Sequence, residues 1–238
     1  MSLPDKDPFG LFKRCHFDSS IIIVCVRWYI TYKLSYRDLV AIMAERNVDV
    51  AHTTILRWVQ RYVPEFEKRW QHYARPVGTS WRVDETYLKV KGKWVYLYRA
   101  VDRTGQTVDF LLSEHRDIAA AKRFFTQAIE KRGVPEKFTL DGYAVSHVAV
   151  AELQEEGILP TELTVRTNKY LNNVIEQDYR RIKQRVRPML SFKRFANATV
   201  TIGGIELVHQ IKKHQFDLSA LCVPPARTPQ VWEAVLAA

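Results

Sequence analysis

The sequence has little cysteine, and the cysteine it has is scattered. Three of its 238 residues are cysteines, Cys15, Cys25 and Cys222, and no two of them form a Cys-x-x-Cys pair. This set is too small and too dispersed for a disulfide framework or a cysteine-ligated zinc site. We therefore interpret the thiols as ordinary side chains of a protein from a reducing compartment.

Long hydrophobic runs are also absent. The longest run near the start, Ile21–Val26, ends at Arg27. It is too short for the core of a signal peptide or for a membrane span. No internal repeat or low-complexity tract is present. The sequence therefore predicts a cytoplasmic protein.

Apolar residues are plentiful, and basic residues exceed acidic ones. The chain is 47% hydrophobic, which excludes a disordered tail, and its formal net charge is +10. Residues 1–80 carry a net charge of +4, residues 81–168 are neutral and residues 169–238 carry +6. Two basic flanks around a neutral centre favour a polyanionic partner, because phosphate contacts need Lys and Arg along the path of the backbone.

The first part of the chain has a helical pattern. Apolar residues recur at three- and four-residue steps from Asp18 to Tyr62, which predicts three short helices. Ser35 and Asp38 are spaced as a capping box for the second of them. This is the outline of a helix-turn-helix domain.

Near residue 80 the sequence pattern changes from the helical spacing of apolar residues to aromatic and β-branched runs typical of strands. The predicted elements then follow in the order βββαβαβα. A long helix with Gly203-Gly204 in its middle comes next, and the glycines suggest close packing there. The expected strands are Trp81–Val90, Trp94–Val101, Thr107–Leu112, Phe138–Leu140 and Leu163–Arg166, and the expected helices run from Asp117 to about Arg132, over Val145–Glu156, from Tyr170 to Arg187 and over Phe192–Gln215. The predicted division is a mobile arm at 1–16, a helix-turn-helix domain at 17–63, a linker at 64–79, a catalytic domain at 80–216 and a tail at 217–238.

Three acidic residues fall where such a fold could gather them. Asp84 lies in the first strand, Asp141 at the tip of the fourth and Glu176 in the long helix. If the first and fourth strands are parallel neighbours, both aspartates meet at one edge, and a helix beside that edge delivers the third carboxylate. Singly, each acid is also compatible with a turn or a helical ion pair.

A carboxylate cluster repels itself unless it holds a cation, and oxygen ligands suit Mg²⁺. Two such ions about 3.5–4 Å apart can drive an in-line displacement at phosphorus. The neighbouring acids are weaker candidates for metal ligands. Strand alternation turns Glu85 to the opposite face from Asp84, and Asp178 points away from Glu176 on the helix.

Longer motifs make the sequence resemble a known family. The segments Val83–Tyr87, Trp94–Asp102 and Lys169–Asp178, with Asp141 between them, resemble the compact bacterial insertion-sequence transposases that form cointegrates by replicative transposition. Thirty-four residues separate Asp141 from Glu176, a spacing frequent in DDE transposases and retroviral integrases. The resemblance extends from about Phe17 to Phe216.

The resemblance implies an α/β fold, namely an RNase H-like mixed five-stranded sheet with flanking helices, preceded by an all-α helix-turn-helix domain. It implies that Asp84, Asp141 and Glu176 are catalytic metal ligands for two Mg²⁺ ions, with Mn²⁺ as a substitute. Lys183 matches the basic residue that such families place two turns after the catalytic Glu. Gly142 departs from the family pattern, which often has Lys there.

The same resemblance implies a reaction and partners. Water would cut a phosphodiester at each transposon end, and the exposed 3′ hydroxyl would attack a target phosphodiester. The partners would be transposon-end duplex DNA, target DNA and further copies of the chain in a dimer or larger synaptic assembly, with the protein associated with the bacterial nucleoid when bound to DNA. Tyr87, Tyr143 and Ser146 lack the activating neighbours that a recombinase nucleophile needs.

The third N-terminal helix would read the terminal inverted repeats in the major groove. Ala51 stands where relatives tend to have a capping Asp, and Thr53 could take over that role. The residues expected near DNA are His52, Thr53, Thr54, Arg57, Gln60, Arg61, Lys169, Arg180, Lys183 and Arg187.

Two other functions remain open at this point. A non-catalytic helix-turn-helix regulator explains the charge and the N-terminus, but not the placing of the three acids. A hydrolytic nuclease would use the same metal site without joining DNA.

Overall fold

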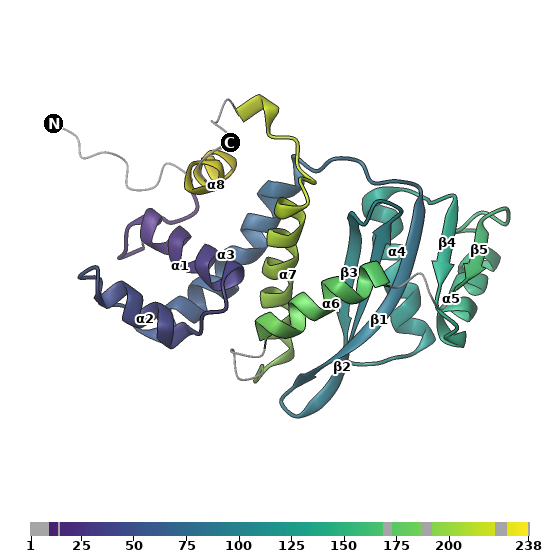
Figure 1. Cartoon of the computed structure of the whole chain (residues 1–238), viewed down its shortest axis with the longest axis horizontal. Coiled ribbons are helices and arrows are strands. Elements are labelled where there is room, and N and C mark those ends of the chain that lie inside the picture. The colour runs from purple at the N-terminus through teal and green to yellow at the C-terminus, as the bar shows by residue number, and fades with distance from the viewer. Residues whose placement is uncertain (1–9, 14, 169–172, 187–191, 222–227, 238) are drawn as a thin grey trace. The chain divides into compact units, whose positions relative to one another are not determined.

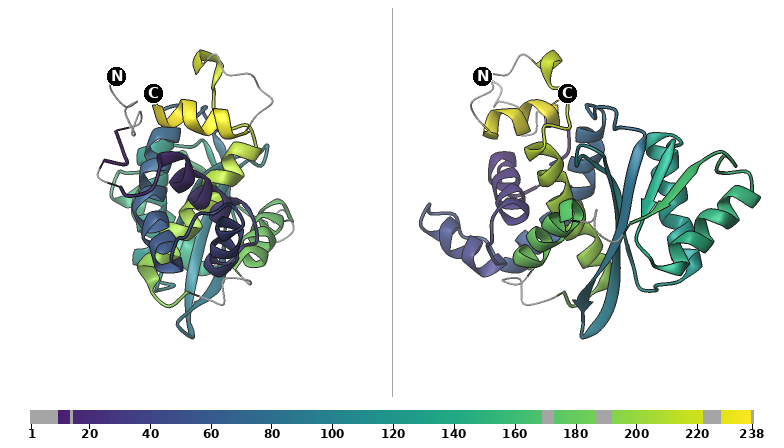
Figure 2. Two further views of the ribbon diagram at one scale, coloured as in Figure 1. Left: turned by 90° about the vertical axis from the view of Figure 1, so that its left-hand side faces the viewer. Right: turned by 45° about the vertical axis from the view of Figure 1, so that its right-hand side comes forward.

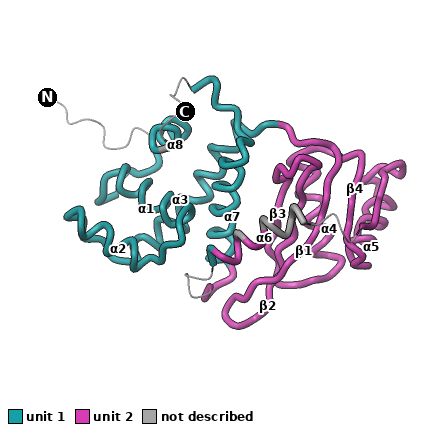
Figure 3. Tube along the Cα trace, in the orientation of Figure 1, with its two compact units in different colours: residues 1–75, 185–190, 196–238 teal, residues 76–184, 191–195 magenta. Residues whose placement is uncertain are grey.

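The computed structural model describes residues 10–13, 15–168, 173–186, 192–221 and 228–237, which belong to two compact units (Figure 3). We call them the helical unit, made of Met1–Arg75, Arg185–Leu190 and Ala196–Ala238, and the sheet unit, made of Pro76–Gln184 and Ser191–Phe195. The sheet unit is thus inserted in the chain between two parts of the helical unit.

The helical unit begins with the three helices that the sequence predicts (Figure 1): α1 (Ser19–Thr31), α2 (Tyr36–Ala44) and α3 (His52–Gln71). The predicted capping box is confirmed at α2, where the Ser35 hydroxyl accepts the Asp38 N–H at 3.2 Å and the Asp38 carboxylate accepts the Ser35 N–H at 2.7 Å. Two backbone N–H groups at the start of α2 are thereby paired, which fixes where the helix begins.

Helix α3 is longer than predicted and continues through Pro64 to Gln71. The expected linker at 64–79 therefore begins inside a helix. Proline removes one helical hydrogen bond, but Phe66 and Trp70 extend the apolar stripe and are fully buried. Burial of these two large rings outweighs the local cost of the proline.

The predicted tail at 217–238 is corrected by the structure, which forms a short 3₁₀ turn at Ser219–Leu221 and helix α8 (Thr228–Ala237). Trp232 of α8 is 2% exposed and its ring lies 5.3 Å from that of Trp70. In the predicted mobile arm, Phe12 is 4% exposed and its ring lies 4.7 Å from that of Tyr62. Buried aromatic side chains thus anchor both segments, and in α8 Val235 and Leu236 are buried beside Trp232.

Helix α7 (Phe195–Lys212) packs closely in the helical unit at the glycine pair. A Cβ atom at Gly204 would lie 2.7 Å from Cγ2 of Ile30 and 3.0 Å from Cγ1 of Val63, and one at Gly203 would lie 2.1 Å from Oε1 of Glu67. The expected close packing is confirmed, because only hydrogen fits between these helices.

The sheet unit has the predicted five strands in the order β3-β2-β1-β4-β5. Strands β1, β2 and β3 are antiparallel neighbours, and β4 and β5 run parallel to β1. Their bounds are Ser80–Val90 for β1, Lys93–Asp102 for β2, Thr107–Ser113 for β3, Lys137–Leu140 for β4 and Thr164–Thr167 for β5.

Helices α4 (Ile118–Arg132) and α5 (Ala144–Glu155) pack together on one face of this sheet (Figure 2). They bury Trp81, Val83 and Phe138 against Phe124 and Phe125. Helix α6 (Asn173–Val186) follows β5. The predicted mixed five-stranded sheet with flanking helices, the RNase H-like arrangement, is confirmed.

Within the described ranges, no helix combines the length and the apolar character needed to cross a membrane.

We expect the substitution Gly204→Ala to lower the free energy of unfolding by about 1–2 kcal/mol. Overpacking against Ile30 and Val63 costs more than the gain in helix propensity from alanine. Urea denaturation followed by circular dichroism measures the change. Thr199→Ala, at an exposed position of the same helix, is the control and should have little effect. Unchanged stability of Gly204→Ala would show that α7 can move away from α1 and α3.

Candidate active site

The fold brings the two predicted aspartates to adjacent positions at one edge. Strands β1 and β4 are parallel neighbours, and Val83 opposite Leu140 is their last pair. Asp84 and Asp141 each follow that pair directly. The arrangement on which the sequence argument depended, parallel pairing of the first and fourth strands, is therefore present.

Local hydrogen bonds orient both carboxylates. Oδ1 of Asp84 accepts the N–H of Glu85 at 2.8 Å, and Oδ1 of Asp141 accepts the N–H of Tyr143 at 3.0 Å. Both aspartates are half-buried. Each retains oxygen lone pairs beyond these bonds, so either can ligate a hard cation.

A buried side chain of helix α6 contacts this strand end. The Tyr179 hydroxyl donates to the carbonyl oxygen of Asp84 at 2.6 Å, with the Leu97 carbonyl 3.4 Å away. Glu176 precedes Tyr179 by three residues on the same helix, which places both positions on one face of α6. The side chain of Glu176 lies outside the described residues. Among the side chains that are described, no cluster of three or more His, Cys, Asp or Glu residues could hold a metal ion.

The acids act on Tyr179 electrostatically. Complete burial raises the pKa of Tyr179 well above its ordinary value, and the negative charge of Asp84 raises it further. Arg99 opposes the rise, and the charges of Glu85 and Asp141 add to it. The hydroxyl therefore stays protonated and remains a donor at neutral pH.

Arg99 supplies positive charge on the same side. It is the cross-strand partner of Asp84 and is fully buried, and its guanidinium carbon lies 5.8 Å from the centre of the Tyr179 ring. Directly opposite residues of an antiparallel pair share one face of the sheet. A buried cation beside Asp84 offsets part of the repulsion that a group of carboxylates generates.

An ion pair between Arg116 and Glu85 lies on the other face of β1. Nε of Arg116 donates to Oε1 of Glu85 at 2.7 Å, and the Arg116 guanidinium lies 3.6 Å from the centre of the Tyr143 ring. Burial raises the pKa of Glu85, Arg116 opposes the rise and the charge of Asp141 adds to it. Glu85 is thus engaged with Arg116, and this contact spans from β1 to the loop that carries Asp141.

His147 supports that loop from the first turn of α5. Its Nε2 lies 3.0 Å from the carbonyl oxygen of Asp141 and 3.4 Å from Oγ1 of Thr167 at the end of β5. The backbone at Asp141 is therefore held both by the strand pairing before it and by a side chain after it.

The basic residues predicted on α6 are described only in part. Arg180 and Lys183 are exposed, and Nζ of Lys183 lies 5.0 Å from the centre of the Tyr87 ring. Lys169 and Arg187 lie outside the described residues.

The residues predicted to read DNA lie along α3. His52, Thr53, Arg57 and Arg61 are exposed, whereas Thr54 and Gln60 are half-buried. The expectation that Thr53 caps the helix is wrong. The N-cap is Ala51, which makes no side-chain capping hydrogen bond, so Thr53 already lies within the first turn.

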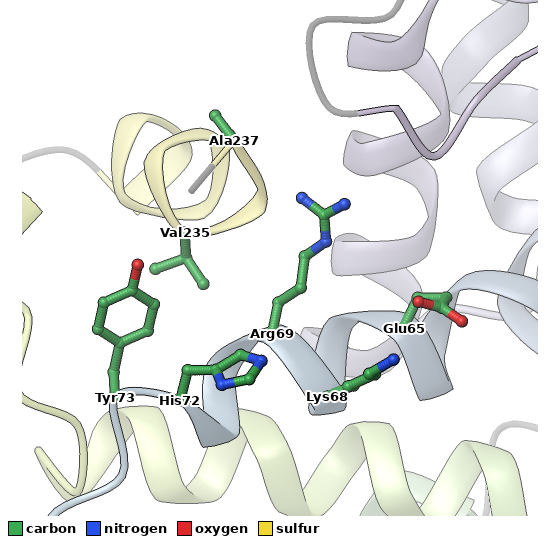
Figure 4. Close-up of a pocket in the computed structure, with 7 residues that line it drawn as sticks. All are labelled: Glu65, Lys68, Arg69, His72, Tyr73, Val235 and Ala237. Carbon is green, nitrogen blue, oxygen red and sulfur yellow. The ribbon is translucent and has the colours of Figure 1, made fainter.

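A pocket of about 500 Å³ opens in the helical unit beside α8 (Figure 4). It contains none of the residues that the sequence predicts for a site. Its lining residues are Glu65, Lys68, Arg69, His72, Tyr73, Val235 and Ala237.

Sequence reasoning missed Tyr179, Arg99 and Arg116. Tyr179 was detectable from its spacing of three residues after Glu176, and Arg99 from its position in the aromatic second strand. Arg116 gave no signal, because its partner Glu85 is 31 residues away in the chain.

Comparison with known proteins gives consistent sequence matches. The family model DDE_Tnp_IS240, described as a DDE domain, matches residues 78–215. The transposase for the insertion sequence-like element IS431mec of Staphylococcus aureus is 40% identical over 202 residues, covering 85% of this chain and 88% of the relative. The Staphylococcus aureus transposase for IS257 in transposon Tn4003 matches with the same identity and coverage.

Solved structures give a weaker likeness. The magnesium complex of the HTLV-2 integrase catalytic core domain is 16% identical with a TM-score of 0.45, covering 58% of this chain and 90% of that chain. The catalytic core domain of BIV integrase is 15% identical with a TM-score of 0.41, covering 55% and 83%. The description of the fold therefore rests on the strand order of this chain.

The substitution Tyr179→Phe should lower the free energy of unfolding by about 1 kcal/mol at pH 7, because it leaves the Asp84 carbonyl without its buried donor. The folded-state pKa of Tyr179 is raised, so the unfolded chain releases this proton first as the pH rises above about 10. The stability due to the hydroxyl is then complete below pH 10 and is lost above it.

Urea denaturation of both proteins between about pH 7 and 11 measures this difference, which should shrink above pH 10. Tyr96→Phe, a half-buried tyrosine of the same sheet, is the control. A difference that stays constant across the range would contradict the buried, protonated hydroxyl.

Proposed function

The chain belongs to the DDE transposases of insertion sequences, and from this premise we propose that it binds terminal inverted repeats, nicks the 3′ ends and joins them to target DNA by metal-dependent transesterification. One observation carries the chemical part of the proposal. Asp84 and Asp141 follow the last pair of two parallel strands, and α6, which contains Glu176, is hydrogen-bonded to the Asp84 carbonyl through Tyr179.

The donor set fits a hard divalent cation. Asp84, Asp141 and Glu176 offer carboxylate oxygens only, the ligands that Mg²⁺ prefers and that Mn²⁺ also accepts. When bound, two such ions supply activation of the attacking oxygen and stabilisation of the leaving oxygen in an in-line displacement. The buried Arg99 limits the repulsion between these carboxylates before a cation binds.

The chain's own residues position this chemistry. Tyr179 holds α6 against the end of β1, and His147 holds the backbone at Asp141. Lys183, exposed one turn beyond Tyr179, is placed to contact a phosphate near the scissile bond. In the first step water would attack the phosphorus of the phosphodiester at the transposon end, and the bond from phosphorus to the 3′ oxygen would break, which gives a 3′ hydroxyl and a 5′ phosphate. In the second step that hydroxyl would attack the phosphorus of a target phosphodiester and displace the target's own 3′ oxygen, so one phosphodiester replaces another.

Recognition of the ends is assigned to residues 17–63 and to the start of α3. The exposed residues His52, Thr53, Arg57 and Arg61 would face the major groove, with Thr54 and Gln60 beside them. Arg180, with Lys169 and Arg187 of the same segment, would contact the DNA backbone. Paired joining needs both ends in one assembly, so we propose a dimer or larger synaptic complex that acts on the bacterial nucleoid.

We expect Asp84→Asn, Asp141→Asn and Glu176→Gln each to reduce joining by about a thousandfold or more while sparing end binding, because each removes a metal ligand. Strand transfer with pre-cut transposon ends, Mg²⁺ and target DNA measures joining. Glu162→Gln, at the opposite end of the β4–β5 edge from Asp141, is the matched control.

Near wild-type joining by any one of the three variants would remove that residue from the site. Cleavage without joining by the intact chain would favour a hydrolytic nuclease, and binding without either reaction would favour a DNA-binding regulator.

Arg57→Ala should weaken specific end binding and flatten base preference at one position by about 1–3 kcal/mol, as expected for loss of one base contact. Binding to a panel of single-base variants of the end measures the preference. Arg37→Ala, which removes an exposed cation from α2, should leave base preference unchanged. Unchanged preference in Arg57→Ala would place Arg57 outside the groove.

A further inference from the structure

Two large aromatic side chains are exposed on the hairpin formed by β1 and β2. Tyr87 is 54% exposed and Trp94 is 50% exposed. Their ring centres lie 4.8 Å apart and their planes are inclined by 85°. Neither ring belongs to the core formed with α4 and α5. Adjacent exposed rings form an apolar patch of the kind found at binding surfaces.

The hairpin holds the two rings in a fixed relation. Lys91 and Gly92 have φ values of 50° and 78°, the left-handed pair of a tight two-residue turn. Lys89 is therefore directly opposite Trp94, and Tyr87 is opposite Tyr96. We call Tyr87, Trp94 and the lysines beside them the hairpin surface.

Each ring of the hairpin surface has a cation beside it. Nζ of Lys89 lies 4.6 Å from the centre of the Trp94 ring, and Nζ of Lys183 lies 5.0 Å from that of Tyr87. Lys91 and Lys93 are exposed at the turn, and residues 86–101 contain no acidic residue. A ring paired with an ammonium group matches a nucleotide, which offers a flat base and an anionic phosphate.

The hairpin surface adjoins the candidate active site. Tyr87 follows Asp84 by three residues on β1, and Lys183 follows Tyr179 by one helical turn on α6. Tyr179 is itself hydrogen-bonded to the Asp84 carbonyl. Strand alternation places Tyr87 and Trp94 on the face of the hairpin that carries Glu85, and Lys183 reaches from α6 to the Tyr87 ring, so a DNA strand that passes the carboxylates and continues past Lys183 would reach these rings.

We propose that the hairpin surface binds an unpaired base of the DNA strand that passes the active site, with the base stacked on Tyr87 or Trp94 and its phosphates contacted by Lys89 and Lys183. Two rings at nearly a right angle form a corner that takes one flat base, stacked on one ring and with its edge against the other. The face of a base is accessible only when that base is unpaired, and the stacking energy offsets the cost of unpairing it. The inference rests on the proposed function, because it assumes a DNA substrate.

The test uses the full chain in EDTA, which prevents cleavage, and a fluorescent 15-nucleotide oligo(dT). Trp94→Ala and Tyr87→Ala should each weaken its binding about 5- to 100-fold, the range for loss of one stacked base. Trp94→Phe should retain most of the affinity. An abasic strand of equal length should bind the wild-type chain as weakly as oligo(dT) binds Trp94→Ala. Tyr32→Ala, which removes a tyrosine that is also 54% exposed, is the matched control and should leave binding unchanged.

A second measurement reports stacking directly. The fluorescence of 2-aminopurine in the oligonucleotide should be quenched by the wild-type chain and recover in Trp94→Ala. The proposal would be overturned if both alanine variants bound oligo(dT) with unchanged affinity. It would also be overturned if the alanine substitutions weakened binding to the abasic strand as much as binding to oligo(dT). Self-association of the DNA-free chain that disappears in Trp94→Ala would also overturn it, by assigning the surface to a second copy.

These outcomes are separable from those of the proposed function. Base-dependent binding by a chain that joins no DNA would leave the hairpin surface in place and remove the transposition chemistry. Normal joining by the wild-type chain, together with oligonucleotide binding that Trp94→Ala leaves unaltered, would support the transposition chemistry and overturn the role of the hairpin surface.

Discussion

The hydrogen bond from the Tyr179 hydroxyl to the Asp84 carbonyl ties helix α6 to the strand end of the candidate site. Strand pairing alone aligns Asp84 with Asp141, but it does not restrain a helix that follows β5 in the chain. The buried tyrosine provides that restraint, because an unsatisfied carbonyl or hydroxyl would be costly at this position. Helix α6, whose residues include Glu176, is thus held to the end of β1 through Tyr179.

Charge around this contact is balanced on both faces of β1. Asp84 has Arg99 as its cross-strand partner on one face, and Glu85 binds Arg116 on the other. Adjacent acids on one strand would otherwise repel each other and Asp141. The two arginines place positive charge beside Asp84 and Glu85 and so offset part of this repulsion.

Much of the fold could be predicted because its signals are local. The capping box at Ser35, the alternation in β1 and β2 and the glycine pair of α7 each follow from a few neighbouring residues. The continuation of α3 through Pro64 and the formation of α8 could not be predicted, since both depend on Trp70 and Trp232, which are far apart in the chain. The aspartate edge was predictable from strand order. Tyr179 and Arg99 had local signals, namely the spacing after Glu176 and the position in the second strand, whereas Arg116 could not be predicted because its partner Glu85 is 31 residues away in the chain. The metal-ligand role of the three carboxylates stays a prediction.

The insertion of the sheet unit into the helical unit has a consequence for biosynthesis. Leu207 and Trp232 belong to the same core as Ile22 and Phe66, so the helices at the start of the chain gain their full apolar cover only after the C-terminal helices have left the ribosome. A product that terminates after the sheet unit lacks that cover. Premature termination therefore leaves α1 and α3 without the part of their core that α7 and α8 supply.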